Sequence, residues 1–245
     1  MLQGLRHDAW YVGHLAGVPL YVHWSVLLLV LLVMSGGGGA ERIILILLAL
    51  VIGIVLHELG HALMARWCGA SGITITLWAF GGLCESRRDV ERIGRELAIV
   101  AAGPAVSLAL WLGCSALLAW LQAHHPHLVS DGYRLSLLAH ALAVGAAVNM
   151  SLFIFNMLPI FPMDGGQLVY YGAIGVTGNR SLARQISLFL AVIGACAFFG
   201  WRTDLWAMLA AGESWTAWAA QLSWSDAFLA LLLLWILRSA FAYLS

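Results

Sequence analysis

Lysine is absent from this 245-residue chain, and charged residues of either sign are scarce. Only 10% of the residues are charged and 62% are hydrophobic, whereas a soluble domain is about one quarter charged and about half apolar. Too few polar side chains are present to cover a water-soluble sphere of this size. The scarcity of charge therefore excludes an ordinary soluble domain and predicts that the bilayer is the main solvent.

Other absences exclude further classes of protein. All basic residues are arginines, and the formal net charge is zero, so no basic patch indicates a nucleic acid partner. The four cysteines lack CxxC spacing and any pairing pattern, which does not favour a disulfide framework or a cysteine metal site. The chemistry of the chain must therefore come from a few polar residues within apolar sequence.

Long apolar runs make up most of what is present. A membrane-spanning helix needs about 20 apolar residues. Six segments are predicted to be such helices: 20–34, 42–67, 96–121, 135–158, 182–200 and 228–244. The first is interpreted as a retained helix rather than a cleaved signal peptide, because 19 residues precede it. We predict an all-α polytopic membrane protein that forms one integral-membrane domain over residues 1–245.

The connection between the second and third predicted helices has a different periodicity. Isoleucine and leucine alternate with threonine and tryptophan over residues 73–78, which predicts strands, and Gly81-Gly82 interrupts them. We expect a small membrane-adjacent β-ribbon over about 71–86. A free strand edge near residues 73–80 could then hold an extended peptide by strand addition.

The remaining connections bear on orientation and on the membrane interface. Arginines are concentrated in the connections on one side, which predicts that both termini and the ribbon are cytoplasmic. Residues 201–225 are too polar to span and contain several tryptophans. An interfacial loop anchored by tryptophan is favoured there over an interfacial helix.

The stretch His57-Glu58-Leu59-Gly60-His61 predicts a metal site. His57 and His61 are four residues apart and share one face of a helix. Two imidazoles so placed can bind one Zn²⁺, and Glu58 between them can activate a water molecule. Because histidine and glutamate are costly to bury in an apolar helix without partners, a chance match is disfavoured.

A third ligand must come from elsewhere, since catalytic zinc usually takes three protein ligands and keeps one position open. Asp164 follows the fourth predicted helix, which Pro159 and Pro162 interrupt. Non-helical backbone at membrane depth is tolerated where it is buried in protein or lines a watery cavity. Asp164 is therefore the candidate third ligand.

These motifs resemble those of the site-2 protease family of intramembrane zinc metalloproteases. Residues 57–61 fit its HExxH motif, and residues 156–165 fit its N-x-x-P-x-x-P-x-D-G motif. The resemblance covers about residues 15–180 and implies a minimal six-helix member without PDZ or CBS domains. It implies these roles: metal ligands His57, His61 and Asp164, general base Glu58, and Asn156 as the residue that positions substrate or stabilises the oxyanion.

Two positions depart from the family pattern. Gln167 stands where many relatives have arginine after Asp-Gly-Gly, and Ser107 stands where asparagine often follows Gly-Pro. Neither departure removes a catalytic group. We interpret both as positions that tune substrate choice or stability.

The resemblance also implies an activity and its setting. We expect one Zn²⁺ per chain and a membrane-spanning protein substrate, cut within the bilayer of the plasma membrane of a bacterium or archaeon. The product would be a released cytoplasmic regulator, such as an anti-sigma factor or a tethered transcription factor. A regulatory membrane partner that gates the site is compatible with this scheme, and the active-site opening is expected to be cytoplasmic.

Two other functions are compatible with parts of the pattern. A transporter or channel could use His57, Glu58, His61 and Asp164 as an ion path, because intramembrane charges mark such paths. It would have inverted repeats, which the sequence lacks. An inactive scaffold would usually lack the glutamate or one ligand, and Asn156 could be a simple interhelical hydrogen-bonding residue.

Overall fold

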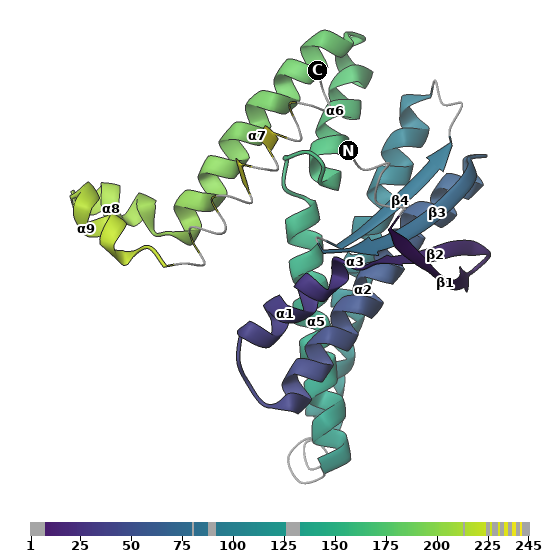
Figure 1. The fold of residues 1–245 in the computed structure, drawn as a ribbon, viewed down its shortest axis with the longest axis vertical. Helices are drawn as coiled ribbons and strands as arrows, with labels where there is room; N and C mark the ends of the chain where they lie inside the picture. The colour runs from purple at the N-terminus through teal and green to yellow at the C-terminus, as the bar shows by residue number, and fades with distance from the viewer. Residues whose placement is uncertain are drawn as a thin grey trace. The chain divides into compact units, whose positions relative to one another are not determined.

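The computed structural model describes residues 8–79, 81–87, 92–125, 133–212 and 214–223, and isolated residues between 226 and 241. The chain divides into two compact units, Met1–Phe155 and Asn156–Ser245, and each is considered by itself (Figure 1). Most of the described chain is helical, with one small sheet, which confirms the predicted fold class.

The described part of the first unit contains α1 (Val26–Ser35), α2 (Ala40–Trp67), α3 (Ile93–His124) and α5 (Tyr133–Asn156), whose last residue begins the second unit. Asn149 and Leu152 of α5 pack against Gly53 of α2, and Phe153 contacts Trp111 of α3. The predicted helix 20–34 begins too early, because residues 18–23 form a strand. At ten residues, or about 15 Å, α1 is too short to cross a bilayer alone.

A four-stranded sheet completes the first unit. Its strands are β1 (Ala9–Leu15), β2 (Val18–His23), β3 (Ser71–Trp78) and β4 (Gly81–Arg87), in that order across the sheet. The predicted ribbon is confirmed as β3 and β4, while β1 and β2 were not predicted. β2 pairs with β3 in parallel and the other neighbours are antiparallel.

The pairing contradicts one expectation. β4 lies on one side of β3, and β2 pairs with Ile75, Thr76 and Leu77 on the other, so the edge expected to be free near residues 73–80 is occupied at these three residues. Phe80, at its end, lies outside the described residues. This pairing has no local signal in the sequence, because α1 and α2 separate β2 from β3 along the chain. The edge strand beside β3 is β4.

The sheet covers the C-terminal half of α2. Ile73, Ile75 and Leu77 of β3 are buried in one cluster with Ala62 and Ala65 of α2. Alternate residues of a strand face the same side, so this run turns one apolar face toward the helix. The small alanines let the strands approach closely, and the sheet is thereby held beside the predicted metal motif.

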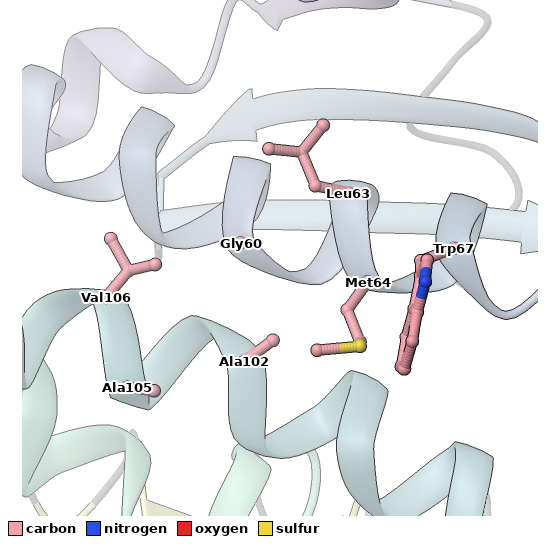
Figure 2. Close-up of a pocket in the computed structure, with 7 residues that line it drawn as sticks. All are labelled: Gly60, Leu63, Met64, Trp67, Ala102, Ala105 and Val106. Carbon is pink, nitrogen blue, oxygen red and sulfur yellow. The ribbon is translucent and has the colours of Figure 1, made fainter.

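Helices α2 and α3 are closest where α2 has a glycine. A Cβ atom added to Gly60 would lie 2.8 Å from the carbonyl oxygen of Ala102 on α3. Figure 2 shows the open apolar groove between the two helices at this level. Its lining consists of Gly60, Leu63, Met64, Trp67, Ala102, Ala105 and Val106. The close approach brings the backbone of α3 within reach of side chains on α2.

The second unit contains α6 (Asp164–Thr177), α7 (Arg180–Arg202), α8 (Leu205–Ala211) and α9 (Trp215–Gln221). α6 was not predicted, and the expected interfacial loop is wrong because residues 205–211 and 215–221 are helical. The side chain of Gln167 donates a hydrogen bond of 3.0 Å to the carbonyl of Pro162, which ties α6 to the preceding turn. Within the predicted helix 228–244, the described residues are helical.

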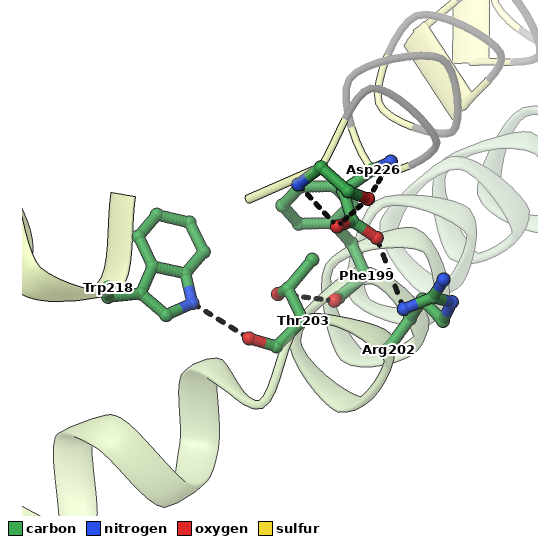
Figure 3. A network of polar contacts seen from close by, with 6 residues as sticks. Phe199, Arg202, Thr203, Trp218 and Asp226 are labelled. Carbon is green, nitrogen blue, oxygen red and sulfur yellow. Dashed lines mark hydrogen bonds and ion pairs between the residues drawn. The ribbon is translucent and has the colours of Figure 1, made fainter. Parts of the chain in front are cut away.

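A polar network joins the end of α7 to the chain beyond α9 (Figure 3). Arg202 lies 3.2 Å from a carboxylate oxygen of Asp226, and the indole of Trp218 donates to the carbonyl of Thr203 at 2.8 Å. Hydrogen bonds from Ser223, together with the Arg202 charge, hold the pKa of Asp226 below its usual value. These contacts stabilise the segment that contains α8 and α9.

Apolar surface on the helices fits a membrane environment. Among the described residues, α2, α3, α7 and residues 137–156 of α5 are long and apolar enough to span a bilayer. Many large apolar side chains on α1 and α2 are more than half exposed, including Leu27, Leu31 and Ile44. Water would disfavour such a surface, whereas lipid would cover it.

Gly60→Ala should destabilise the protein by about 1–3 kcal/mol, because its Cβ would push α3 away from α2. Gly113→Ala, on α3 with nothing within 4 Å of the added atom, is the matched control. The control should be neutral or slightly stabilising, since alanine is a better helix former. Thermal unfolding in detergent measures both, and equal Tm values would contradict the close approach.

Candidate metal centre

The metal motif lies in the buried half of α2. His57, Glu58 and His61 are 4%, 7% and 7% exposed, and one ligand atom from each lies within 4.8 Å of the others. The spacing of three and four residues places them together on the helix. Three potential ligands that converge in an apolar helix can hold a metal ion.

The two imidazoles turn the same ring nitrogen toward each other. His57 Nε2 and His61 Nε2 are 3.2 Å apart. Two nitrogens at about 2.05 Å from a tetrahedral zinc ion lie about 3.3 Å apart. The histidine pair therefore has the nitrogen–nitrogen separation that one tetrahedral zinc ion requires.

The other ring nitrogens are held by α3. His61 Nδ1 donates to the carbonyl oxygen of Ile99 at 2.8 Å, which places the proton on Nδ1 and leaves a lone pair on Nε2. His57 Nδ1 lies 2.9 Å from Ser107 Oγ. Such outer partners fix the tautomer and the ring orientation of metal-binding histidines. The donor set thus fits zinc.

Gly103 keeps the space beside these nitrogens open. A Cβ atom at this position would lie 2.7 Å from His57 Nε2 and closer still to His61 Nε2. It would therefore clash with both imidazole rings. Glycine lets the backbone of α3 form one wall of the centre without filling it.

The carboxylate of Glu58, on α2, lies against the sheet. A Cβ atom added to Gly82 of β4 would lie 2.6 Å from the carboxylate carbon of Glu58. Residue 82 is paired with Leu77 of β3, so the register of the sheet sets this contact. The tertiary fold thereby places the carboxylate next to strand β4.

The remaining sequence-predicted residues belong to the second unit. Asn156 is the last residue of α5, and Asp164 is the first residue of α6, after a non-helical turn. The helix ends at Asn156, two residues earlier than predicted. The first unit brings His57, Glu58 and His61 together, and the approach of Asp164 and Asn156 to them stays a prediction.

Comparison with known proteins identifies the family. Residues 45–131 and 122–200 match Peptidase family M50. The chain belongs to this family. It is 34% identical over 184 residues to "Putative zinc metalloprotease sll0528" of Synechocystis, which is 69% of this chain and 45% of that protein. Stage IV sporulation protein FB of Bacillus subtilis is 32% identical over 50% of this chain and 38% of its own length.

The similarity to a solved structure concerns the fold. A site-2 protease from Methanocaldococcus jannaschii matches with a TM-score of 0.56 and 22% identity, over 96% of this chain and 94% of that one. The M50 chain spans less than half the length of the curated relatives that it matches. The structural match shows that its fold is that of a site-2 protease.

Sequence analysis missed the part of the centre that α3 supplies. The roles of Ile99, Gly103 and Ser107 were not predicted, although Ser107 stands out as a departure from the family pattern. Their spacing of four residues is a signal, because it places them on one helix face. A backbone carbonyl such as that of Ile99 leaves no signal in a sequence.

Gly103→Ala should weaken zinc binding by at least about tenfold, which is the lower range for disturbing an outer partner of a zinc ligand. The added methyl group would displace the histidine nitrogens from their present separation. Competition with a coloured chelator measures the Kd, and Gly113→Ala again serves as the control. Unchanged affinity in Gly103→Ala would show that the space beside Gly103 is not where the metal binds.

Proposed function

We propose that this M50 chain is an intramembrane zinc metalloendopeptidase that hydrolyses peptide bonds of membrane-spanning helices. The observation that carries the proposal is the 3.2 Å separation of His57 Nε2 and His61 Nε2, beside Glu58, on a helix long enough to span a bilayer. The family, and the names of its zinc metalloprotease relatives, support the same chemistry.

The ligands proposed for the metal are His57, His61 and Asp164, with one zinc ion per chain. A bound zinc ion supplies an acidified water and polarises the scissile carbonyl. Glu58 would accept a proton from the attacking water as the new C–O bond forms, and would deliver it to the leaving nitrogen as the C–N bond breaks. Asn156 is proposed to donate a hydrogen bond to the oxyanion, worth about 3 kcal/mol by comparison with other oxyanion holes.

Burial of the centre places two demands on the reaction. Water must reach Glu58 by a polar route, which we propose opens on the cytoplasmic side. The substrate must unwind locally, because the peptide bonds of a membrane helix are sheltered by their own hydrogen bonds. An unwound segment adjacent to Glu58 would then present its carbonyl to the metal.

The proposed setting is regulated intramembrane proteolysis by a multi-pass protein of the plasma membrane. Release of a cytoplasmic regulator, such as an anti-sigma factor or a tethered transcription factor, is the proposed outcome. Both termini are proposed to be cytoplasmic, with residues 1–245 acting as one membrane protease domain. A transporter is disfavoured by family membership, and the presence of both histidines and the glutamate disfavours an inactive scaffold.

Glu58→Gln should retain one zinc ion per chain and lose about 10²–10⁴-fold in cleavage rate, the contribution typical of a general base. The assay uses a co-expressed reporter with one membrane-spanning helix and a cytoplasmic tag, and metal analysis of the purified protein measures zinc. Cleavage at the wild-type rate would rule out the mechanism. Loss of zinc would instead make Glu58 a ligand or a structural residue.

Asp164→Asn should raise the Kd for zinc by more than about 100-fold, beyond the loss caused by outer partners. The matched control is Asp204→Asn, because Asp204 precedes α8 and its side chain does not cap that helix. Zinc affinity is measured by chelator competition on both variants. If the two variants bind zinc alike, Asp164 is not the third ligand.

A further inference from the structure

One face of α3 meets both imidazoles of the metal motif. Ile99, Gly103 and Ser107 recur every fourth residue and therefore lie along the same side of the helix. His61 contacts Ile99 and His57 contacts Ser107, so α2 and α3 run antiparallel at this point. α3 thus supplies one outer partner for each histidine, with bare backbone at Gly103 between them.

The two outer partners differ chemically. The Ile99 carbonyl oxygen can only accept a hydrogen bond, so His61 is fixed with its proton on Nδ1. The Ser107 hydroxyl can either accept or donate. His57 can therefore keep its contact with Ser107 in either of its two neutral tautomers.

This difference matters because the two Nε2 atoms are 3.2 Å apart. Without a metal, two facing lone pairs repel, and a proton on His57 Nε2 that is donated to His61 Nε2 removes the repulsion. Ser107 would then donate to His57 Nδ1. With zinc, both Nε2 atoms need lone pairs, and His57 Nδ1 must carry the proton and donate it to Ser107 Oγ.

Ser107 is suited to this role by its burial. Its side chain is fully buried, at 0% exposed, in the apolar middle of α3. A hydroxyl buried without a partner costs free energy, so the 2.9 Å contact with His57 stabilises both groups.

We propose that Ser107 is the positioning residue that holds His57 in one ring orientation through the change of tautomer that accompanies zinc binding. The proposal rests on the proposed zinc function and deepens it. It gives a physical role to one of the two positions at which the sequence departs from the family pattern. Ser107 does not touch the metal or the substrate, and it acts through His57.

The test is zinc affinity of the full-length protein in detergent, measured by chelator competition. Ser107→Ala should raise the Kd by about 10–100-fold, the usual cost of losing an outer partner. Ser187→Ala is the matched control, since Ser187 is equally buried on α7 and its hydroxyl has no hydrogen-bond partner among the described residues. The control should bind zinc as the wild type does.

A second pair of variants distinguishes the loss of the hydroxyl group from the effects of a cavity or a folding defect. Ser107→Thr and Ser107→Val have nearly the same shape, but only threonine keeps the hydroxyl. Threonine should retain most of the zinc affinity and valine should lose it, and the visible spectrum of the cobalt-substituted proteins should change in valine alone. The thermal stability of the metal-free threonine and valine proteins reports any purely structural role.

The outcomes separate the two proposals. If the wild type binds no zinc, the proposed function fails and the role of Ser107 fails with it. If the wild type binds zinc and the valine variant binds it equally well, only the role of Ser107 is overturned. A loss of metal-free stability in valine with unchanged zinc affinity also overturns it, because Ser107 would then be a packing residue.

Discussion

Two imidazole nitrogens held 3.2 Å apart inside an apolar helix are the constraint on which the first unit depends. In a low-dielectric surrounding, two facing ring nitrogens are unfavourable unless each ring is held by its other nitrogen and a cation or proton lies between them. α3 holds both rings by their Nδ1 atoms. The close approach of α2 and α3 at Gly60 and the bare backbone at Gly103 are the conditions under which it can do so.

The sheet packs against the part of α2 that contains the two imidazoles and Glu58. Its apolar face packs on the C-terminal half of α2, and the register of β3 and β4 brings Gly82 against Glu58. Helix and sheet therefore enclose a carboxylate and two imidazoles within a unit whose outer surface is apolar. Polar groups inside and apolar side chains outside are the reverse of the arrangement in a soluble protein. This arrangement suits a protein in lipid, where buried polar groups are tolerated if they have partners.

The long helices could be predicted from sequence patterns, whereas the short helices and two of the strands could not. The helices α2, α3, α5 and α7 were predicted to within a few residues, because each is a long apolar run that only a helix can satisfy in lipid. β1 and β2 were missed although a tight turn joins them, with positive φ at Ala16 and Gly17. The apolar residues Leu20, Tyr21 and Val22 fit the start of a helix equally well, since a short apolar run has no decisive periodicity. α6, α8 and α9 were missed for the related reason that they are short.

The sequence by itself determined the membrane class of the chain, the choice of His57, Glu58 and His61 as candidate metal-site residues, and the family resemblance. Composition and long apolar runs suffice for the membrane class. Local spacing suffices for the histidine pair, because residues four apart on a helix share a face whatever surrounds it. Only the tertiary structure decided that β3 is an inner strand, that β4 lies against Glu58, and that α3 holds both histidines. Those features depend on contacts between residues 24 to 55 positions apart in the chain, including a backbone carbonyl that has no counterpart in the sequence pattern.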